Sequence, residues 1–356
     1  MTTSSAEPPK TYDDANRKRM VRAWRNIGAI VPGLVLCFVV SGAAFSVRLA
    51  PGMASFSQMI LAIMIGSALN NIVGTPSWAR QGVAFAQRRL LRTAIVLLGL
   101  QLTAAQVIEV GGRGFGIIAA TLLATFAFTV WLGRLFRIDY RLARLIAAGT
   151  SICGASAVIA TNMVTGAKDE DVTYAIACVT VFGTLAMFVF PLTPGLLGLD
   201  PHAFGLWAGA SIHEIAQVMA AAFQEGQQAG ESATVAKLSR VLLLAPMVLA
   251  LGLVATTKAD QFSSGVNGEP ARPPIPLFVL GFVSLVAINS LISIPVEARG
   301  WIASVTTGLL TTALAAMGLE TSMSKLAAKG IRPALLGALS FVFVACFSLT
   351  LVKLTG

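Results

Sequence analysis

The chain has 356 residues, of which 56% are hydrophobic and 12% are charged, and its mean hydropathy is +0.78. Soluble domains contain about 45–50% apolar and about 25% charged residues, so this composition excludes an ordinary soluble enzyme. The net charge of +10 does not indicate a nucleic-acid partner, because the Lys and Arg residues lie in short clusters between long apolar runs. The lipid bilayer is the partner that this composition predicts.

A membrane-spanning helix needs about 20 mostly apolar residues, and a series of such runs follows a polar, basic stretch at residues 1–26. We expect that stretch to be a cytoplasmic tail. The predicted spans cover residues 27–45, 56–73, 90–108, 115–132, 145–164, 172–190, 203–223, 238–255, 275–292, 301–319 and 335–351. The predicted fold class is therefore an all-α polytopic membrane protein with about eleven transmembrane helices.

The basic residues between these spans concentrate in alternate loops, beginning with the tail. By the positive-inside rule this distribution predicts a cytoplasmic N-terminus and a C-terminus on the outside. The four cysteines lie inside apolar runs without metal-ligand spacing, so we expect no disulfide framework and no metal site.

An internal repeat is suggested by the second and seventh spans, where Gly66–Ile72 matches Gly209–Ile215 in its order of small, apolar and polar residues. Weaker matches follow along the two halves at offsets that rise from 143 to 155 residues. They predict an extra N-terminal helix, 27–45, before two inverted five-helix repeats, 56–190 and 203–351. The alternative is a coincidental pattern in a bundle of eleven helices.

The fifth span contains two glycines and several hydroxyls in mid-membrane, which favours an unwound backbone, and the tenth span has a similar group. Helices broken at these points would direct N-terminal N–H groups and positive dipole ends toward an anion. The predicted substrate-binding residues are Thr150, Ser151, Cys153, Gly154, Ser156, Thr306, Thr307 and Gly308. The alternative is close helix packing, with hydroxyls bonded to the helix's own carbonyls.

A second polar group lies in the seventh span, and repeat symmetry would place two asparagines of the second span opposite it. Glu214 is the acidic residue well inside a span, and a carboxylate beside an imidazole can bind and release a proton. The predicted coupling-ion or proton site consists of Asn70, Asn71, His213, Glu214 and Gln217. The same residues could hold Na⁺, and a structural hydrogen-bond network is the third interpretation.

Two arginines, Arg92 and Arg240, begin the third and eighth spans near opposite membrane faces. They are candidates for gating or for attracting an anionic substrate. The alternative is that their side chains extend to the lipid headgroups.

Residues 149–157 (GTSICGASA), 209–217 (GASIHEIAQ) and 92–100 (RTAIVLLGL) resemble the YeiH family (UPF0324) of bacterial inner-membrane proteins. The resemblance covers nearly the whole chain. It implies a bacterial inner-membrane location, the family's label of sulfate exporter, and membership of the bile-acid symporter and cation–proton antiporter superfamily. That superfamily's fold implies ten core helices in inverted repeats, with the fourth helix of each repeat broken, so that the fifth and tenth spans would cross.

These patterns together predict a secondary active transporter rather than an enzyme. We expect a small anion, sulfate or an organosulfonate, to be exported by alternating access, with H⁺ or Na⁺ as coupling ion and no other cofactor. A passive channel, or an intramembrane serine hydrolase using Ser156 and His213, are the alternatives from other classes. Small-residue surfaces are compatible with a homodimer.

Overall fold

The computed structural model describes residues 12–50, 53, 56–259, 277–292, 294–321 and 331–355, and all regular structure in them is helical. Six helices of this part of the chain are long and apolar enough to cross a membrane, and shorter apolar helices accompany them. Helix α1 begins at Tyr12, inside the expected tail, while residues 1–11 lie outside the described part.

The helices follow one another with short connections. The first half contains α1 (Tyr12–Arg48), α2 (Gln58–Ile72), α3 (Arg80–Phe85), η1 (Ala86–Leu90), α4 (Leu91–Leu98), η2 (Gly99–Gln101), α5 (Ala104–Leu135), α6 (Tyr140–Ser151), α7 (Ala155–Thr165), α8 (Asp169–Val189), η3 (Phe190–Leu192) and α9 (Pro194–Leu197). The second contains α10 (Pro201–Ser211), α11 (Ile215–Ala222), α12 (Gln227–Leu242), α13 (Leu244–Ala259), α14 (Leu277–Leu291), α15 (Val296–Glu320) and α16 (Ile331–Thr355).

Local sequence signals explain where several helices begin. The Asp139 carboxylate accepts hydrogen bonds from the N–H groups of Arg141 and Leu142, and the Asp200 carboxylate accepts one from Ala203. Such side chains satisfy N–H groups that have no partner within the helix. Pro201 follows Asp200 at the first helical position, where a missing N–H costs nothing.

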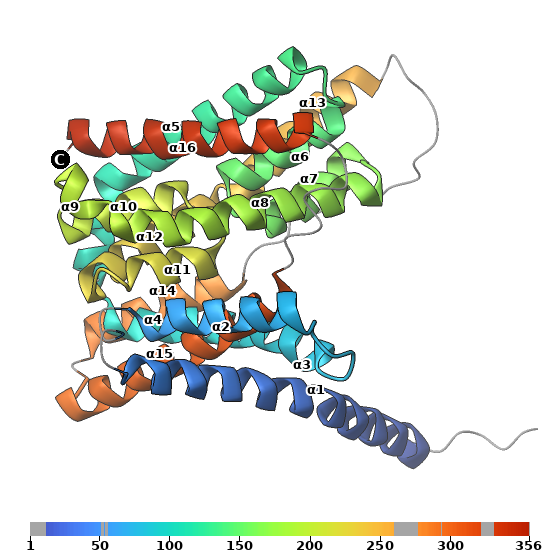
Figure 1. Ribbon diagram of the computed structural model, residues 1–356, viewed down its shortest axis with the longest axis vertical. Coiled ribbons are helices and arrows are strands. Elements are labelled where there is room, and N and C mark those ends of the chain that lie inside the picture. The colour runs from blue at the N-terminus through green and yellow to red at the C-terminus, as the bar shows by residue number, and fades with distance from the viewer. Residues whose placement is uncertain are drawn as a thin grey trace, which may run out of the picture.

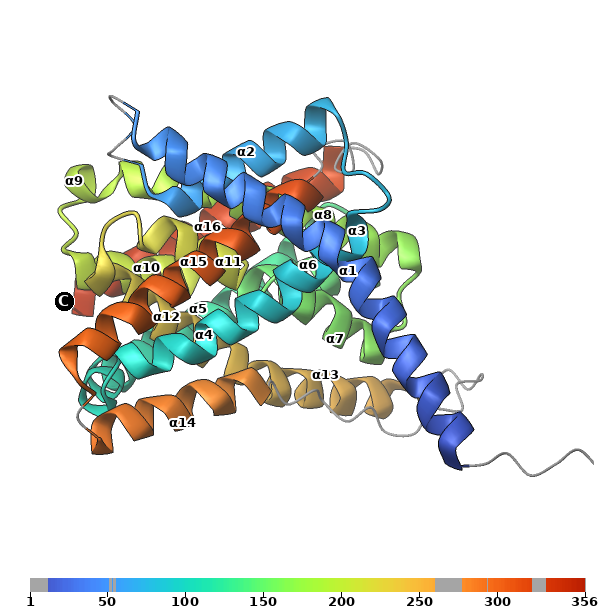
Figure 2. The same cartoon turned by 90° about the horizontal axis from the view of Figure 1, so that it is seen from below.

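The helices form two layers, which Figure 1 shows one above the other. The lower layer, which we call the α15 layer, contains α1 to α4, α14 and α15; the upper layer, the hairpin layer, contains α5 to α13 and α16. Figure 2, turned by 90°, shows α14 and α13 along one edge of the molecule. An apolar core joins the layers, with Met59 and Ile63 of α2 and Leu314 of α15 packed among the buried alanines of α10 and α11.

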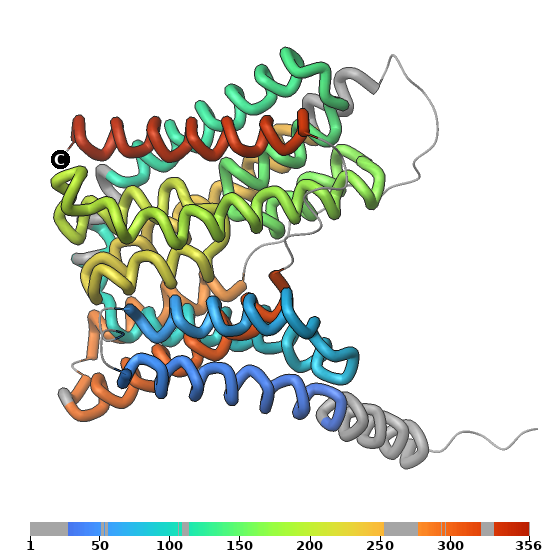
Figure 3. The backbone as a smooth tube through the Cα atoms, in the orientation of Figure 1, coloured from blue at the N-terminus to red at the C-terminus, as the bar shows by residue number. Residues whose placement is uncertain are grey.

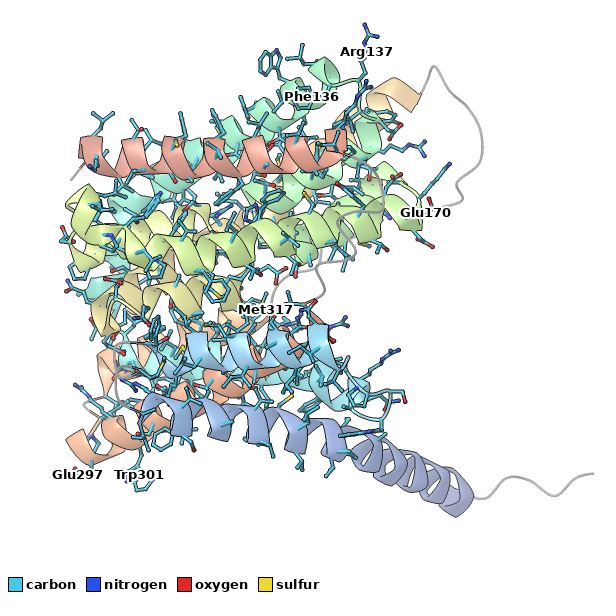
Figure 4. All side chains as sticks on the ribbon, viewed as in Figure 1. Phe136, Arg137, Glu170, Glu297, Trp301 and Met317 are labelled. Atoms are coloured by element: carbon cyan, nitrogen blue, oxygen red, sulfur yellow. The ribbon has the colours of Figure 1, made fainter. Side chains whose placement is uncertain are left out.

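The two ends of the molecule are marked in Figure 4 by Arg137 and Glu170 on one side and by Glu297 and Trp301 on the other. We call them the Arg137 end and the Trp301 end. The end of α16 lies at the Trp301 end (Figures 1 and 3), and α1 starts beyond the Arg137 end (Figure 1).

The fifth predicted span is a helical hairpin rather than a single crossing. Arg141, at the start of α6, donates a hydrogen bond from Nη1 to the carbonyl of Gly166, just after α7, at 2.8 Å. A Cβ added to Gly149 would lie 2.8 Å from the side chain of Val158, so the two helices also touch near the bend. The segment 140–165 therefore enters from the Arg137 end, turns at residues 152–154 and returns.

The seventh predicted span is a second hairpin. Helix α10 runs parallel to α12, because Gly205 packs against Ala229 and Gly209 against Ala236. Helix α11 runs antiparallel to α12, because Thr234 Oγ1 lies 3.3 Å from Met219 Sδ while Gly230, earlier in α12, packs against Phe223. The chain therefore reverses between α10 and α11, and this hairpin enters from the Trp301 end.

Each hairpin and the helix that follows it form one unit. The two units have the same order of elements and enter the molecule from opposite ends. Helix α8 carries the chain from the base of the first hairpin to the base of the second, and α12 then runs back past the second. The hairpin tips share the sequence Gly-x-Ser-Ile, at 149–152 and at 209–212. These two Gly-x-Ser-Ile sequences are 60 residues apart. The predicted five-helix repeat relies on matches 143 to 155 residues apart, so it pairs different segments.

The expectation of a broken tenth span is wrong, because α15 is continuous from Val296 to Glu320. The hydroxyls of Thr311 and Thr312 donate to the carbonyls of Thr307 and Gly308 in the same helix, as the packing alternative required. The predicted crossing of the fifth and tenth spans is therefore also wrong.

The predicted five-plus-five division is not confirmed. Helix α2 is a single helix where the seventh span is a hairpin, and the fifth span is a hairpin where α15 is a single helix. Two spans that return to the end they entered leave fewer full crossings than the eleven predicted.

Candidate functional site

The tips of the two hairpins meet inside the hairpin layer. Gly154 has φ +69°, a conformation that strains any residue with a side chain, and it ends the first tip. A Cβ at this position would lie 2.5 Å from Cγ of Glu214 in the second tip. Two conditions therefore require glycine at this position: the positive φ angle and the close contact with Glu214.

Lys237 of α12 binds both tips. Its Nζ donates to the carbonyl of Ile152 in the first tip at 2.9 Å, and to those of Ile212 and His213 in the second. The side chain is 0% exposed. Buried ammonium groups are rarely tolerated without partners, and here the partners are main-chain oxygens from two separate hairpins.

Arg240, one turn further along α12, does the same with its guanidinium. It donates from Nη2 to the carbonyl of Thr150 at 2.7 Å and from Nε to that of Ser151 at 3.1 Å. On the other tip, Nη1 donates to the carbonyls of Gly209 and Ile212 at 3.3 and 3.2 Å. These oxygens belong to the C-terminal ends of α6 and α10, which carry partial negative charge, so the two cations stabilise both ends.

The N-terminal end of α7 is open by comparison. Its N-cap residue, Gly154, has no side chain to accept a hydrogen bond, and the first N–H groups of a helix, here those of Ala155 and Ser156, have no acceptor within the helix. Ser156 is exposed, whereas the preceding tip residues are buried. A helix N-terminus with free N–H groups and an adjacent hydroxyl is suited to an anion.

Glu214 and Gln217 organise the N-terminal end of α11. They form a capping box, in which each side chain accepts a hydrogen bond from the backbone N–H of the other residue. Glu214 Oε1 also accepts a hydrogen bond from Thr180 Oγ1 of α8 at 2.9 Å, and Gln217 Nε2 donates to the Thr180 carbonyl. Glu214 remains partly exposed and lies against Gly154, so its side chain marks the edge of the buried tips.

His213 is buried behind this boundary. Its ring lies 6.0 Å from that of Phe341 on α16, and its Nδ1 has no hydrogen-bond partner. No hydrogen bond joins it to Ser156 within the described residues.

The structure brings the predicted residues of the fifth and seventh spans together, while those of the second and third spans contact other partners. Thr150, Ser151, Cys153, Gly154, Ser156, His213, Glu214, Gln217 and Arg240 all lie in or against the tips. Asn70 and Asn71 instead donate to the carbonyl of Thr321 at the end of α15. Arg92 is exposed and lies over the ring of Phe278, 5.7 Å from its centroid.

The predicted substrate-binding residues of the tenth span lie on the continuous helix α15 and form no hairpin tip. Thr306 is buried, with a hydroxyl that has no partner, whereas Thr307 is half-buried and Gly308 exposed on the continuous helix.

Two residues with a clear structural role were not predicted. Lys237 was assigned to a loop before the eighth span, because the apolar run begins at Leu238. Its spacing of three residues from Arg240 within a helix is the signal that places both on one face. Thr180 gave no signal beyond being a hydroxyl in an apolar span.

Relatives of this chain are membrane proteins. A family model described as conserved hypothetical protein 698 matches residues 32–337. The chain is 36% identical over 327 residues to the UPF0324 inner membrane protein YeiH of Escherichia coli K12, which covers 90% of this chain and 93% of the relative.

Two further relatives extend the similarity. A UPF0324 membrane protein of Pseudomonas aeruginosa is 35% identical over 338 residues, 92% of this chain and 95% of the relative. One of Yersinia pestis is 37% identical over 327 residues, 88% and 90% respectively. The chain belongs to the UPF0324 family of bacterial membrane proteins, which includes YeiH.

Proposed function

We propose that this membrane protein is a secondary active transporter of a small anion. The observation that carries the proposal is the meeting of two helical hairpins, one from each end of the molecule, at a buried pair of cations. Broken helices of this kind place half-helix ends near the membrane midplane, where transporters bind their substrates. Two hairpins from opposite ends also supply a gate on each side of such a site.

The anion binds at the N-terminal end of α7. The N–H groups of Ala155 and Ser156 and the Ser156 hydroxyl donate to it, and the positive end of the helix dipole adds to the attraction. Lys237 and Arg240 neutralise the negative ends of α6 and α10, which would otherwise oppose an anion at the tips. Sulfate or an organosulfonate fits this donor set, since both present several acceptor oxygens.

Glu214 couples the anion to a proton. Its side chain touches Gly154, the residue before the α7 N-terminus, so an ionised carboxylate there repels a bound anion. A protonated carboxyl group removes this repulsion and can itself donate a hydrogen bond to the anion. Anion and proton therefore bind together and cross together, and the sum of their gradients decides between uptake and export.

We assign the Arg137 end to the cytoplasm. It carries Arg80, Arg137, Arg141 and Lys168, in keeping with the positive-inside rule. This assignment puts the start of α1 on the cytoplasmic side of the membrane and the end of α16 on the outside.

Uptake of radiolabelled sulfate into proteoliposomes tests the proposal, with and without imposed proton and sodium gradients. We expect wild-type flux to follow the proton gradient and Glu214→Gln to lose that response while still exchanging sulfate for sulfate. The matched control is Glu225→Gln, in the turn between α11 and α12, which should behave as wild type. Flux driven by Na⁺ alone would replace the proton with sodium, and flux indifferent to every gradient would contradict coupled transport.

Ser156→Ala tests the anion site itself. Loss of one charge-assisted hydrogen bond of about 1.5–3 kcal/mol corresponds to roughly a tenfold to hundredfold rise in the half-saturating sulfate concentration. Unchanged affinity in this variant would place the anion elsewhere.

A further inference from the structure

Four buried polar atoms behind the hairpin tips have no hydrogen-bond partner. They are Thr121 Oγ1 and Thr125 Oγ1 of α5, Ser151 Oγ of the first tip and His213 Nδ1 of the second, on side chains no more than 1% exposed. Thr234 and Thr311, by contrast, donate to the carbonyl four residues earlier in their own helix, whereas Thr161 and Thr306, on α7 and α15, also have hydroxyls without a partner. A buried polar atom without a protein partner is costly, so a group of them indicates a binding site.

Helix register places these atoms within about two helical turns of one another along the bundle. The antiparallel helices α5 and α6 meet where Gly133 packs against Ala143, so eight residues further into the bundle Thr125 lies level with Ser151. The next turn of α5 brings Thr121 to the same face.

Helix α16 relates the second tip to the same level. Thr129 of α5 donates to Ser340 at 2.9 Å, and the neighbouring Phe341 packs on His213. His213 therefore lies within about a helical turn of Thr125 along the bundle.

The charges around these atoms do not balance. Lys237 and Arg240 place two fully buried basic side chains here, and Arg240 Nε donates to the carbonyl of Ser151 itself. The C-terminal ends of α6 and α10 contribute about half a negative charge each. Glu214 also acts on Lys237, but the positive N-terminal end of α11 offsets part of its charge, so the region behind the tips carries net positive charge.

We propose that a monovalent, monoatomic anion of the halide class is bound behind the tips, next to Lys237 and Arg240. The hydroxyls of Thr121, Thr125 and Ser151 donate to it, together with His213 in the tautomer that carries hydrogen on Nδ1. Because every lining side chain is buried, the site takes an anion without a hydration shell and excludes a tetrahedral oxyanion. This anion is a fixed part of the structure, separate from the substrate site at the α7 N-terminus, and the inference does not rest on the proposed function.

The test is halide-dependent stability of the full-length protein purified in detergent. The thermal unfolding midpoint is measured in sodium gluconate with increasing sodium chloride or bromide at constant ionic strength. We expect the midpoint to rise with saturation in both halides, since a ligand that binds only the folded state stabilises it. Sulfate at the same ionic strength should not reproduce the rise at this site.

Variants locate the response. In Thr125→Val and in Ser151→Ala we expect halide affinity to fall by about tenfold or more, while Thr311→Val on α15 keeps the wild-type affinity. Crystals of the wild-type protein grown in bromide should show anomalous scattering between Thr125 and Arg240, which needs no variant to fold.

Equal midpoints in gluconate and chloride, together with no bromide peak at this position, would overturn the proposal. So would a halide response that both Thr125→Val and Ser151→Ala leave unchanged, because the anion would then bind elsewhere. Radiolabelled chloride carried across proteoliposomes would overturn the assignment of a fixed ion, whatever the result with sulfate.

Discussion

Lys237 and Arg240 show how two residues can determine the arrangement of a membrane domain. Each donates to carbonyls of both hairpin tips, so several main-chain oxygens of each tip have their partner on α12 rather than in their own hairpin. In a bilayer no water is available to replace them. The position of one hairpin relative to the other therefore depends on α12.

Lys237→Met preserves much of the side-chain volume and removes the ammonium group. We expect a clear fall in thermal stability, because each orphaned buried carbonyl costs about 1–3 kcal/mol. Hydrogen exchange should increase in both 150–154 and 209–214, since the lysine serves both. Lys353→Met, at the exposed end of α16, is the control. Faster exchange in one tip only would show that the lysine does not join them.

Gly154→Ala combines backbone strain with a steric clash. The positive φ alone costs about 1 kcal/mol or more in a residue with a Cβ, and Cγ of Glu214 occupies the position that the Cβ needs. We expect lower stability and loss of anion flux in proteoliposomes. Gly300→Ala in α15 meets open space at a helical position and should be neutral or stabilising. A Gly154→Ala protein with wild-type stability would contradict the contact between the tips.

At the scale of elements, the sequence predicts where a helix is interrupted, but it does not predict whether the chain then continues across the membrane or reverses. The glycines of 149–157 indicated an interruption, and it lies there. Periodicity cannot distinguish a broken helix that continues from one that reverses, because both bury the same apolar residues. The reversal depends on contacts between distant residues, such as Arg141 with Gly166.

The polar residues of the seventh span illustrate the same limit. Glu214 and Gln217 are predicted site residues because polar groups are costly in a membrane, and both lie at the tips. Their partner Thr180 lies on a different helix, so no spacing in the sequence could identify it. Asn70 and Asn71 were assigned to the same site by symmetry, and they bind the end of α15 instead.

Side-specific labelling tests the hairpin topology. With Cys346 replaced by Ser, Arg137→Cys and Lys168→Cys should react with an impermeant maleimide from one side of the membrane. Asp200→Cys and Glu225→Cys should react from the other. Single crossings at 140–165 and 201–222 would separate the members of each pair, so labelling of Arg137→Cys and Lys168→Cys from opposite faces would exclude the hairpins.

At the scale of the whole molecule, polar links between the two layers gather at the Trp301 end. The Ser57 backbone N–H donates to Gln224 Oε1, and Gln227 Nε2 donates to Gln101 Oε1 at 3.1 Å. Both connect the α15 layer to the turn between α11 and α12, while Ser156 and Glu214 remain accessible further along. For an alternating-access transporter this arrangement corresponds to a state closed at the Trp301 end.

Cross-linking can hold this end closed. In a background without Cys346, Gln101→Cys and Gln227→Cys joined by a short bis-maleimide should lose sulfate flux in proteoliposomes, because the layers can no longer separate there. Arg141→Cys with Lys168→Cys, both at the base of one hairpin, should cross-link and retain flux. Binding of sulfate to the cross-linked Gln101–Gln227 protein should persist, since the α7 N-terminus stays accessible from the Arg137 end. Full flux in the cross-linked protein would mean that transport proceeds without separation of the layers at this end, and the gate would then have to lie within the hairpin layer.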